Sequence, residues 1–358
     1  MTKKVLIPAE KDGNSFFDGI TENSGWQFDY GHLYSDITGY AVLLIHWPEQ
    51  LFKWQEPTKA QLEELAGLFT VWKQTLNIVY VVHNEKRHWG MTANFEQLYQ
   101  LVLNNCDTMV HFGEYSLKKY QKSYPDIHHE LLSHPLYSLS FDLVDKKLAR
   151  KQLGLKEDKK IMLVPGNVRN KAERSLITKA FDKLPLNNKL LLSQNMFYKQ
   201  TSIEFPGRYA LKKIVDIKRI VEYFYNQEYK TTYKLGYGFV DTQKLSLMTS
   251  AADVIMVPRL DALNSGIVFW AMTFNKVVIG PAIGNMKEVL EAAKLPVFNP
   301  QNLQSVEKAL RRGFQLQEDQ YKYPINVLMK HNPKVLAEQW DAFLNGVLLK
   351  GKNLTRGA

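Results

Sequence analysis

The chain has 358 residues, of which 45% are hydrophobic and 12% aromatic, so it holds enough apolar material for more than one core. Its longest apolar runs have the length of strands, and none approaches the roughly 18 residues that a membrane-spanning helix requires. A single cysteine, Cys106, excludes an internal disulfide and fits a reducing compartment. A strand expected from Val5 leaves no room for a signal peptide. We therefore expect a two-domain protein located in the cytoplasm.

The net charge of +10 is divided unevenly between the two halves. Residues 1–150 hold 14 Lys and Arg against 18 Asp and Glu, a balance of −4, so residues 151–358 hold 32 against 18, a balance of +14. Ordinary solvated surface charge accounts for this pattern, and so does a field that attracts a phosphorylated ligand to the second half. The sequence has no helix-turn-helix, zinc-ligand spacing or basic–aromatic recognition motif, so we expect no nucleic-acid partner.

Strand-length apolar runs alternate with amphipathic helical patterns along the chain. In the first half, the expected strands are residues 5–7, 41–45, 78–82 and 108–110, and the expected helices are residues 58–75 and 95–104. A charged stretch over residues 145–160 is the expected linker. In the second half, the expected strands are residues 161–164, 189–192, 254–257 and 277–279, and a last helix is expected over 332–349.

Two apolar strands in the second half flank one helix, and such a crossover implies parallel pairing within an α/β layer. With the alternation in the first half, this predicts two Rossmann-like, doubly wound domains that face an interdomain cleft at the carboxyl ends of their strands. We expect an N-terminal domain over residues 1–155, with the helix at about 332–350 packing back on it, and a C-terminal domain over residues 156–331.

The most informative stretch of the chain is residues 258–288. A buried strand ends at Pro258, a turn with Asn264-Ser265-Gly266 follows, and a helix then runs to Met272. Free backbone N–H groups and the positive end of a helix meet at such a turn, which suits a bound diphosphate. The plainer alternative is an ordinary helix cap, for which Asn and Ser are common choices.

Three blocks of the second half resemble, in order, the donor domain of bacterial GT-B glycosyltransferases of family 4, also called glycosyl transferases group 1. Residues 166–181, which open with Gly166-Asn167-Val168-Arg169, are similar to its first segment, residues 239–258 to its next, and residues 258–288 to the one after that. The resemblance implies that this domain binds a nucleotide-diphosphate sugar.

The first half carries matching features. The sequence His46-Trp47-Pro48-Glu49 resembles a segment of polysaccharide-building members of this group, and residues 83–88 resemble their H-N-x-x-x-H segment. The resemblance implies a hexosyltransferase that moves a sugar to a hydroxyl of a glycan or lipid-diphosphate-linked glycan acceptor in surface polysaccharide biosynthesis. Such an enzyme would work in the cytoplasm, peripherally at the inner membrane face.

The resemblance also assigns roles in binding the donor. Arg169 would clamp the diphosphate and neutralise the charge that grows on it, and Gly166, Ser265 and Gly266 would line the same site. The lysine that relatives carry three residues after this arginine is Ala172 here, so Lys171 is the expected substitute. A pair of glutamates in relatives corresponds to Ala262 and Trp270. The remaining donor-binding candidates are Gly13, Asn14, Phe239, Val240, Asn264 and Glu288.

Catalysis and acceptor binding are expected in the first half. His83 ends an apolar strand and by resemblance contacts the transferring sugar or the acceptor, where a neutral imidazole accepts a proton or holds a hydroxyl. The expected acceptor-binding residues are His46, Asn84 and His88. If the enzyme inverts the anomeric centre, the base is expected among Glu85, His83 and Asp12; if it retains the configuration, the leaving phosphate can take the proton itself.

No metal or other cofactor is expected. His128 and His129 are adjacent and would point apart on a regular element, and no D-x-D motif lies in a suitable loop. Residues 51–54, with Phe69 and Trp72, offer an apolar, aromatic edge for membrane contact, although an aromatic stripe of this spacing is also typical of a core. Two other functions fit the sequence: a GT-B sugar-nucleotide epimerase and a non-catalytic protein that binds a nucleotide sugar or glycan.

Overall fold

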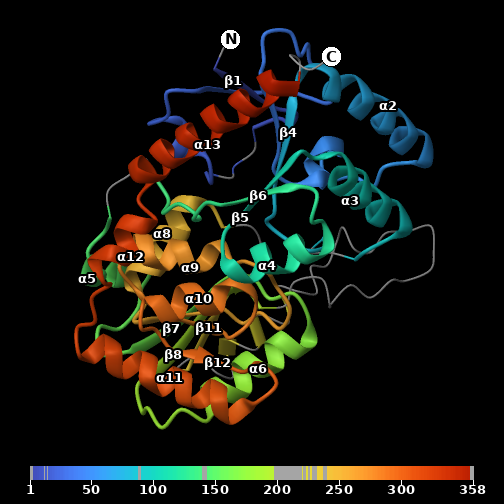
Figure 1. The fold of residues 1–358 in the computed structure, drawn as a ribbon. Coiled ribbons are helices and arrows are strands. Elements are labelled where there is room, and N and C mark those ends of the chain that lie inside the picture. Colours follow the sequence, from blue (N-terminus) through green and yellow to red (C-terminus); the bar gives the residue numbers. More distant parts are fainter. Residues whose placement is uncertain are drawn as a thin grey trace, which may run out of the picture. The chain divides into compact units, whose positions relative to one another are not determined.

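The computed structural model describes residues 3–11, 13, 15–87, 90–138, 143–196, 220, 223–224, 226–227, 232–236 and 240–354. The chain divides into two compact units. The first comprises Met1–Ser138, Ala262–Asn264 and Ile325–Ala358, and the second comprises Leu139–Asp261 and Ser265–Pro324. Each unit contains a six-stranded parallel sheet with helices packed around it, so the predicted α/β fold class is confirmed (Figure 1).

The sheet of the first unit has the strand order β2-β1-β3-β4-β5-β6. Its strands are β1 (Lys4–Ile7), β2 (Gln27–Tyr30), β3 (Val42–Ile45), β4 (Asn77–Val81), β5 (Thr108–His111) and β6 (His128–Leu131). The central strands are buried on both faces, as apolar runs in a parallel sheet should be. The two edge strands, β2 and β6, were not expected from the sequence because they carry polar residues and are only partly buried.

Helices cover both faces of this sheet. They are α1 (Asp18–Thr21), the 3-10 helix η1 (Pro48–Phe52), α2 (Lys59–Thr75), α3 (Ala93–Asn105), α4 (Glu114–Ser123), α12 (Ile325–Lys330) and α13 (Pro333–Leu354). Helices α2 and α3 share one apolar core with the sheet, whereas α13 and the residues around α1 share the other. Thr58 begins α2 with a capping box in which its side chain and that of Gln61 each bond the other residue's backbone N–H. The C-terminal helix α13 places the fully buried Trp340 in the second of these cores.

The sheet of the second unit has the strand order β12-β11-β10-β7-β8-β9. Its strands are β7 (Lys160–Asn167), β8 (Lys189–Asn195), β9 (Tyr233–Leu235), β10 (Val254–Met256), β11 (Val277–Pro281) and β12 (Val297–Phe298). Its helices are α5 (Lys146–Gln152), α6 (Lys171–Asp182), α8 (Thr242–Ala251), α9 (Gly266–Thr273), α10 (Gly284–Ala292) and α11 (Leu303–Glu318). The parallel pairing of β10 with β11 across the crossover helix α9 is the pairing that the sequence predicted.

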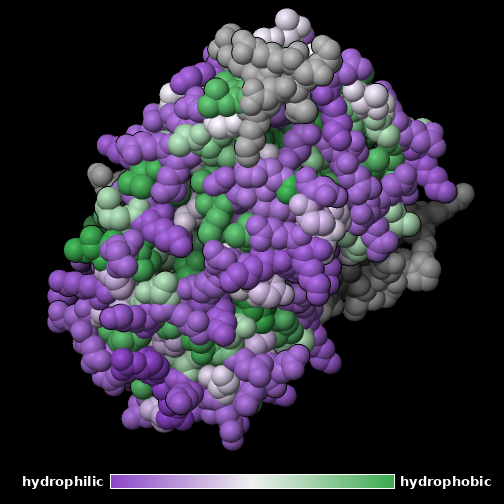
Figure 2. All heavy atoms as spheres, viewed as in Figure 1, coloured by the Kyte–Doolittle hydropathy of each residue, from purple (hydrophilic) through white to green (hydrophobic). Residues whose placement is uncertain are grey.

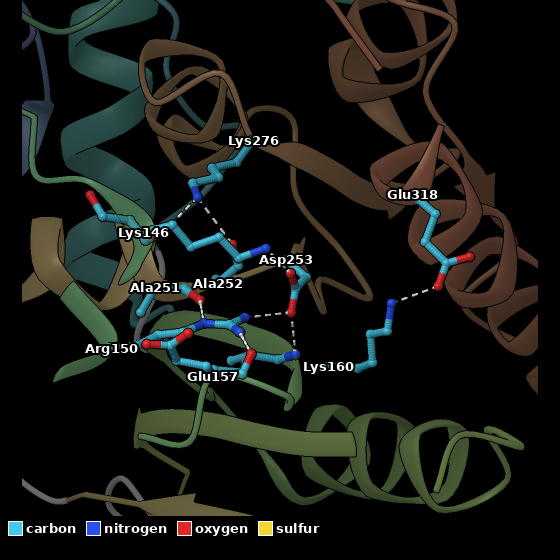
Figure 3. A network of polar contacts seen from close by, with 11 residues as sticks. Lys146, Arg150, Glu157, Lys160, Ala251, Ala252, Asp253, Lys276 and Glu318 are labelled. Atoms are coloured by element: carbon cyan, nitrogen blue, oxygen red, sulfur yellow. Dashed lines mark hydrogen bonds and ion pairs between the residues drawn. The ribbon is translucent and has the colours of Figure 1, made fainter. Parts of the chain in front are cut away.

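The chain passes to the second unit at Leu139, before the charged stretch that was expected to be a linker. That stretch contains α5, which is anchored by the buried carboxylate of Asp253 (Figure 3). The Arg150 guanidinium donates to Asp253 at 2.8 Å, and the Lys146 ammonium lies 2.5 Å from its other oxygen. The charged stretch therefore forms a helix that is held by Asp253. This partner lies about a hundred residues further along the chain, so the local sequence does not reveal the contact.

A third cation, Lys276, makes contacts in the same region. The Lys276 ammonium donates to the carbonyl oxygens of Ser250 at 2.6 Å and Ala252 at 3.1 Å, next to Asp253 (Figure 3). Burial lowers the pKa of Lys276 to about 8, and the positive charge of Lys146 acts in the same direction. These contacts tie the end of α8 to the amino end of β11.

Candidate functional site

Two arginines lie at the carboxyl edge of the second sheet. Arg169 follows β7, and Arg259 follows the neighbouring strand β10. In a parallel sheet the loops after adjacent strands meet at one edge, which is where ligands bind in doubly wound folds. The structure thus brings a second guanidinium group to the site that the sequence assigned to Arg169 alone.

A buried carboxylate organises these arginines. Glu173, which is only 2% exposed, accepts from the Arg259 side chain at 3.0 Å and from the Arg169 backbone N–H at 2.7 Å. Arg259 also donates to the Asn167 carbonyl at 3.1 Å. Burial and, to a smaller extent, the charge of Arg259 lower the pKa of Arg169 to about 10, against the opposing effects of Glu173 and Asp261. Arg169 is therefore still charged at neutral pH, in a setting where water screens its charge poorly.

The start of α9 lies next to this loop. Gly166 has a φ of 74°, and a Cβ at this position would be 3.7 Å from Ile267 in the first turn of α9. Ser265 precedes that turn and makes no side-chain capping hydrogen bond. Because the first N–H groups of a helix have no partner within the helix, the first turn of α9 offers donors beside the arginine loop. The loop that holds Gly166 and Arg169 thus lies beside Ser265 and Gly266 at the start of α9.

The other donor-site candidates are more dispersed. Lys171 is the exposed first residue of α6, next to the exposed Ala172. Glu288 is half-buried on α10, and Val240 precedes the Asp241 cap of α8. Phe239 lies outside the described residues. The sequence reasoning missed Arg259, although an arginine directly after the proline that ends a buried strand was a usable signal.

The carboxyl edge of the first sheet has a different character. His46 follows β3 and His83 follows β4, and their rings stack with centroids 4.3 Å apart. The indole of Trp47 also stacks with His83, at 4.1 Å, and its centroid lies 4.5 Å from that of the His46 ring. Phe16, from the loop after β1, packs edge-on against both imidazoles at 4.9 Å, and against His134 at 4.8 Å. The two histidines assigned to catalysis and acceptor binding therefore belong to one aromatic stack.

Two buried imidazoles of this cluster, those of His46 and His134, are neutral. Burial lowers the pKa of His46 well below its ordinary value, and it lowers the pKa of His134 to about 3. The carbonyl of Pro135 accepts from Nδ1 of His134 at 2.7 Å, which leaves Nε2 as the acceptor nitrogen of that ring. A neutral imidazole can orient a hydroxyl or accept its proton, so this edge suits an uncharged, hydroxylated ligand.

Two asparagines fix the backbone at His83. Asn264 donates from its side chain to the His83 carbonyl at 2.8 Å and to the Val82 carbonyl at 3.3 Å. In the amide orientation that satisfies both neighbours, Asn84 donates to the same His83 carbonyl at 3.0 Å and accepts from the Trp47 indole at 3.3 Å. Asn264 thus belongs to the first unit, in which Leu263 also packs in the core, whereas the sequence placed it with Ser265 at the phosphates.

Two of the remaining candidates of the first unit, Glu85 and Gly13, lie in the described part of the chain. Glu85 forms an ion pair with Lys119 of α4 at 2.5 Å and is about a third exposed. Gly13 has open space around its Cα, with no atom within 4 Å of where a Cβ would lie. His88 and Asn14 lie outside the described residues, as does Asp12.

Glu49 is a buried carboxyl that the sequence reasoning left without a role. It is 2% exposed and accepts from the Tyr99 hydroxyl at 2.9 Å, which joins η1 to α3. Burial raises its pKa above the ordinary range. Within the motif His46-Trp47-Pro48-Glu49, Glu49 therefore has a structural role, which only its contact with the distant Tyr99 reveals.

No family model matches the sequence, and no curated protein matches it by sequence. Solved structures do match its fold. A glycosyltransferase from Rickettsia africae ESF-5 aligns with a TM-score of 0.60 and 12% identity over 96% of this chain and 98% of that chain. An α,α-trehalose-phosphate synthase (UDP-forming) from Burkholderia vietnamiensis aligns with a TM-score of 0.59 and 9% identity over 98% and 99%. Anabaena HepE in complex with UDP aligns with a TM-score of 0.54 and 12% identity over the full length of both chains.

The chain has the GT-B fold. At sequence identities this low, structural similarity establishes the fold alone. Membership of family 4 stays a prediction. Within the described ranges, no group of three or more His, Cys, Asp or Glu side chains is arranged to hold a metal ion. The helices in the same part of the chain are all too short or too polar to cross a membrane.

Proposed function

We propose that this protein is a glycosyltransferase that moves a sugar from a nucleotide-diphosphate sugar to a hydroxyl group. The observation that carries the proposal is the pair of guanidinium groups at the carboxyl edge of the second sheet, beside the start of α9. Like charges held together in a buried setting are costly, and a bound diphosphate would offset their repulsion. The UDP complex of Anabaena HepE and the UDP-forming synthase, both of the same fold, support a nucleotide of this kind.

The chemistry of the transfer assigns a role to each edge. The bond between the sugar and the β-phosphate oxygen breaks, and negative charge grows on the leaving diphosphate. Arg169 and the N–H groups of α9 would stabilise that charge where it develops. The acceptor hydroxyl supplies the new glycosidic oxygen, and its proton passes to His83 or to the leaving phosphate itself. In this scheme the protein's own cations stabilise the leaving group, and no metal or other cofactor takes part.

The acceptor in this proposal is a glycan or a lipid-diphosphate-linked glycan in surface polysaccharide biosynthesis, and the transferred sugar is a hexose. The sequence resemblance supports this assignment. It also supports a peripheral association of the enzyme with the inner membrane face. Phe69 and Trp72, which the sequence offered as part of an apolar edge, are buried in the core. On the face shown in Figure 2, hydrophobic residues are interspersed among hydrophilic ones, so membrane contact would use a limited area.

Thermal unfolding with a panel of UDP, GDP and ADP, each alone and as its sugar conjugate, tests the donor site. A ligand at about 100 times its dissociation constant adds roughly 2.7 kcal/mol of stability. We expect one nucleotide family to raise Tm, and Arg169→Ala to abolish the rise. A panel in which no nucleotide shifts Tm, or an Arg169→Ala variant that responds like the wild type, would refute the proposal.

Product analysis separates transfer from the alternatives. With the stabilising nucleotide sugar and a panel of glycan acceptors, a glycosyltransferase releases the nucleoside diphosphate and forms an elongated glycan. An epimerase would instead convert the donor to its epimer without any acceptor. Binding without either reaction would identify a nucleotide-sugar-binding protein.

A further inference from the structure

An exposed tryptophan, Trp54, lies beside the partly buried Trp47 of the histidine stack in the first unit. Trp54 is 42% exposed, and its ring lies 6.0 Å from that of Trp47, which itself stacks on His83. It follows η1, in the loop after β3. At this exposure a large part of the indole remains in contact with solvent and is accessible to a ligand.

The backbone that carries Trp54 is strained. Lys53 and Trp54 have φ values of 52° and 64°, and they are the only consecutive non-glycine residues with positive φ in the described part of the chain. Side chains with a Cβ avoid this region, so the surrounding structure must hold both residues there. Strain of this kind concentrates at sites where the chain presents a side chain to a ligand.

Contacts from three neighbouring segments hold the loop in this conformation. The Trp54 N–H donates to the Glu49 carbonyl at 2.9 Å, and the Arg87 guanidinium donates to the Trp54 carbonyl at 3.5 Å. The Lys53 ammonium pairs with Glu10, from the loop after β1, at 2.5 Å. Residues from the loops after β1, β3 and β4 therefore contact the backbone and the neighbouring side chain of Trp54.

The surroundings of the two indoles indicate the class of ligand. The hydrophobic faces of pyranose rings, which present C–H bonds, pack on the faces of aromatic side chains, and their edges carry hydroxyl groups that need donors and acceptors. Trp54 and Trp47 supply the faces, Lys53 and Glu10 supply exposed charged groups, and the partly buried Arg87 contacts the Trp54 carbonyl. A lipid surface would favour further apolar side chains here, but the residues that flank Trp54 are Lys53 and the exposed Gln55.

We propose that Trp47 and Trp54 form a platform that binds a pyranose ring of the glycan acceptor, next to His83. The inference rests on the proposed function, because it names the acceptor as a glycan whose sugar ring is recognised by stacking. It adds a binding residue, Trp54, which the sequence placed only in an apolar edge for membrane contact.

Saturation-transfer NMR on the full chain tests the platform without any donor. The probes are methyl pyranosides and disaccharides built on glucose, galactose and N-acetylglucosamine, with uridine and phosphatidylcholine vesicles as competing occupants. We expect at least one sugar to bind, with the strongest transfer to the C–H protons of one ring face. Trp54→Ala should weaken its affinity at least tenfold, and Trp54→Phe, which keeps an aromatic face, should weaken it by only a few fold.

Tyr115→Ala is the matched control, because Tyr115 is a 47% exposed aromatic residue on α4 of the same unit. Its affinity for the sugar should equal that of the wild type. Three results would overturn the platform. No sugar binds the wild type, Trp54→Ala binds the sugar as tightly as the wild type, or the Trp54→Ala change weakens binding of uridine or vesicles and leaves sugar binding unchanged. Nucleotide-induced stabilisation should persist in Trp54→Ala, so failure of the platform and failure of the donor site give different results.

Discussion

The carboxyl edges of the two sheets share an architecture and differ in chemistry. The edge of the second sheet holds two guanidinium groups around one buried carboxylate, beside a helix start. The edge of the first sheet holds neutral imidazoles and aromatic rings in a stack. A charged edge can stabilise a leaving diphosphate, whereas a neutral, aromatic edge can orient a sugar and its hydroxyl. The comparison teaches that the parallel sheet supplies the location and the residues after each strand supply the chemistry.

The largest expected difference between the two units is in their stability at acid pH, where the first unit should be destabilised more than the second. All nine histidines lie in the first unit, and burial lowers the pKa of His111 and His134 to about 3 and that of His331 to about 4. Below the unfolded pKa of about 6.5, only the unfolded chain takes up these protons, so the free energy of unfolding falls as the pH drops. Each such histidine should remove about 1.4 kcal/mol per pH unit between about pH 6 and pH 4.

Hydrogen exchange measured by mass spectrometry can follow each unit separately. Between pH 7 and pH 5, after correction for intrinsic exchange, peptides of the first sheet should lose protection before those of the second. Equal loss in both units would show that the buried imidazoles do not control the stability of the first.

Removal of the carboxylate should damage the charged edge severely. Glu173→Ala leaves Arg259 buried without its ionic partner, which should cost about 3–5 kcal/mol in the free energy of unfolding. Denaturant unfolding gives the value. Glu291→Ala removes an exposed carboxylate on α10 from a surface pair with Lys287 and should cost less than about 0.5 kcal/mol. Similar losses in the two variants would contradict the compensating role of Glu173.

Arg169→Ala should weaken binding of the nucleoside diphosphate and slow transfer, with a combined loss of about 3 kcal/mol, or roughly 100-fold. Calorimetric titration and steady-state kinetics measure the two parts. Lys171→Ala is the control, because Lys171 lies two residues away with an exposed side chain. If Lys171→Ala proves the more damaging change, the lysine carries the role that we give to the arginine.

The neutral edge should tolerate loss of an imidazole. His46→Phe keeps a ring of similar size in the stack and removes a nitrogen that has no hydrogen-bond partner, so we expect a change in stability below about 1.5 kcal/mol. Thermal unfolding at pH 7 measures it. A loss as large as that of Glu173→Ala would mean that His46 makes a polar contact on which the fold depends.

The sequence predicted the fold class well because apolar strands and crossover helices leave a clear periodic pattern. It missed β2 and β6, whose residues are polar at the edge of the sheet, and it read α5 as a linker because the partner of Arg150 is Asp253, about a hundred residues away. Arg169 could be proposed from the sequence because it directly follows an expected strand in a segment that resembles the donor domain. Arg259, the stack at His83 and the side-chain contact of Asn264 depend on long-range packing, which local patterns do not encode.

Hydrogen exchange of the full chain with and without the nucleoside diphosphate that raises Tm most tests the central claim directly. The nucleotide should slow exchange in the loop at residues 166–173 and in the first turn of α9, and this protection should be absent in Arg169→Ala. Protection confined to other segments, or unchanged protection in that variant, would contradict a diphosphate site at the carboxyl edge of the second sheet.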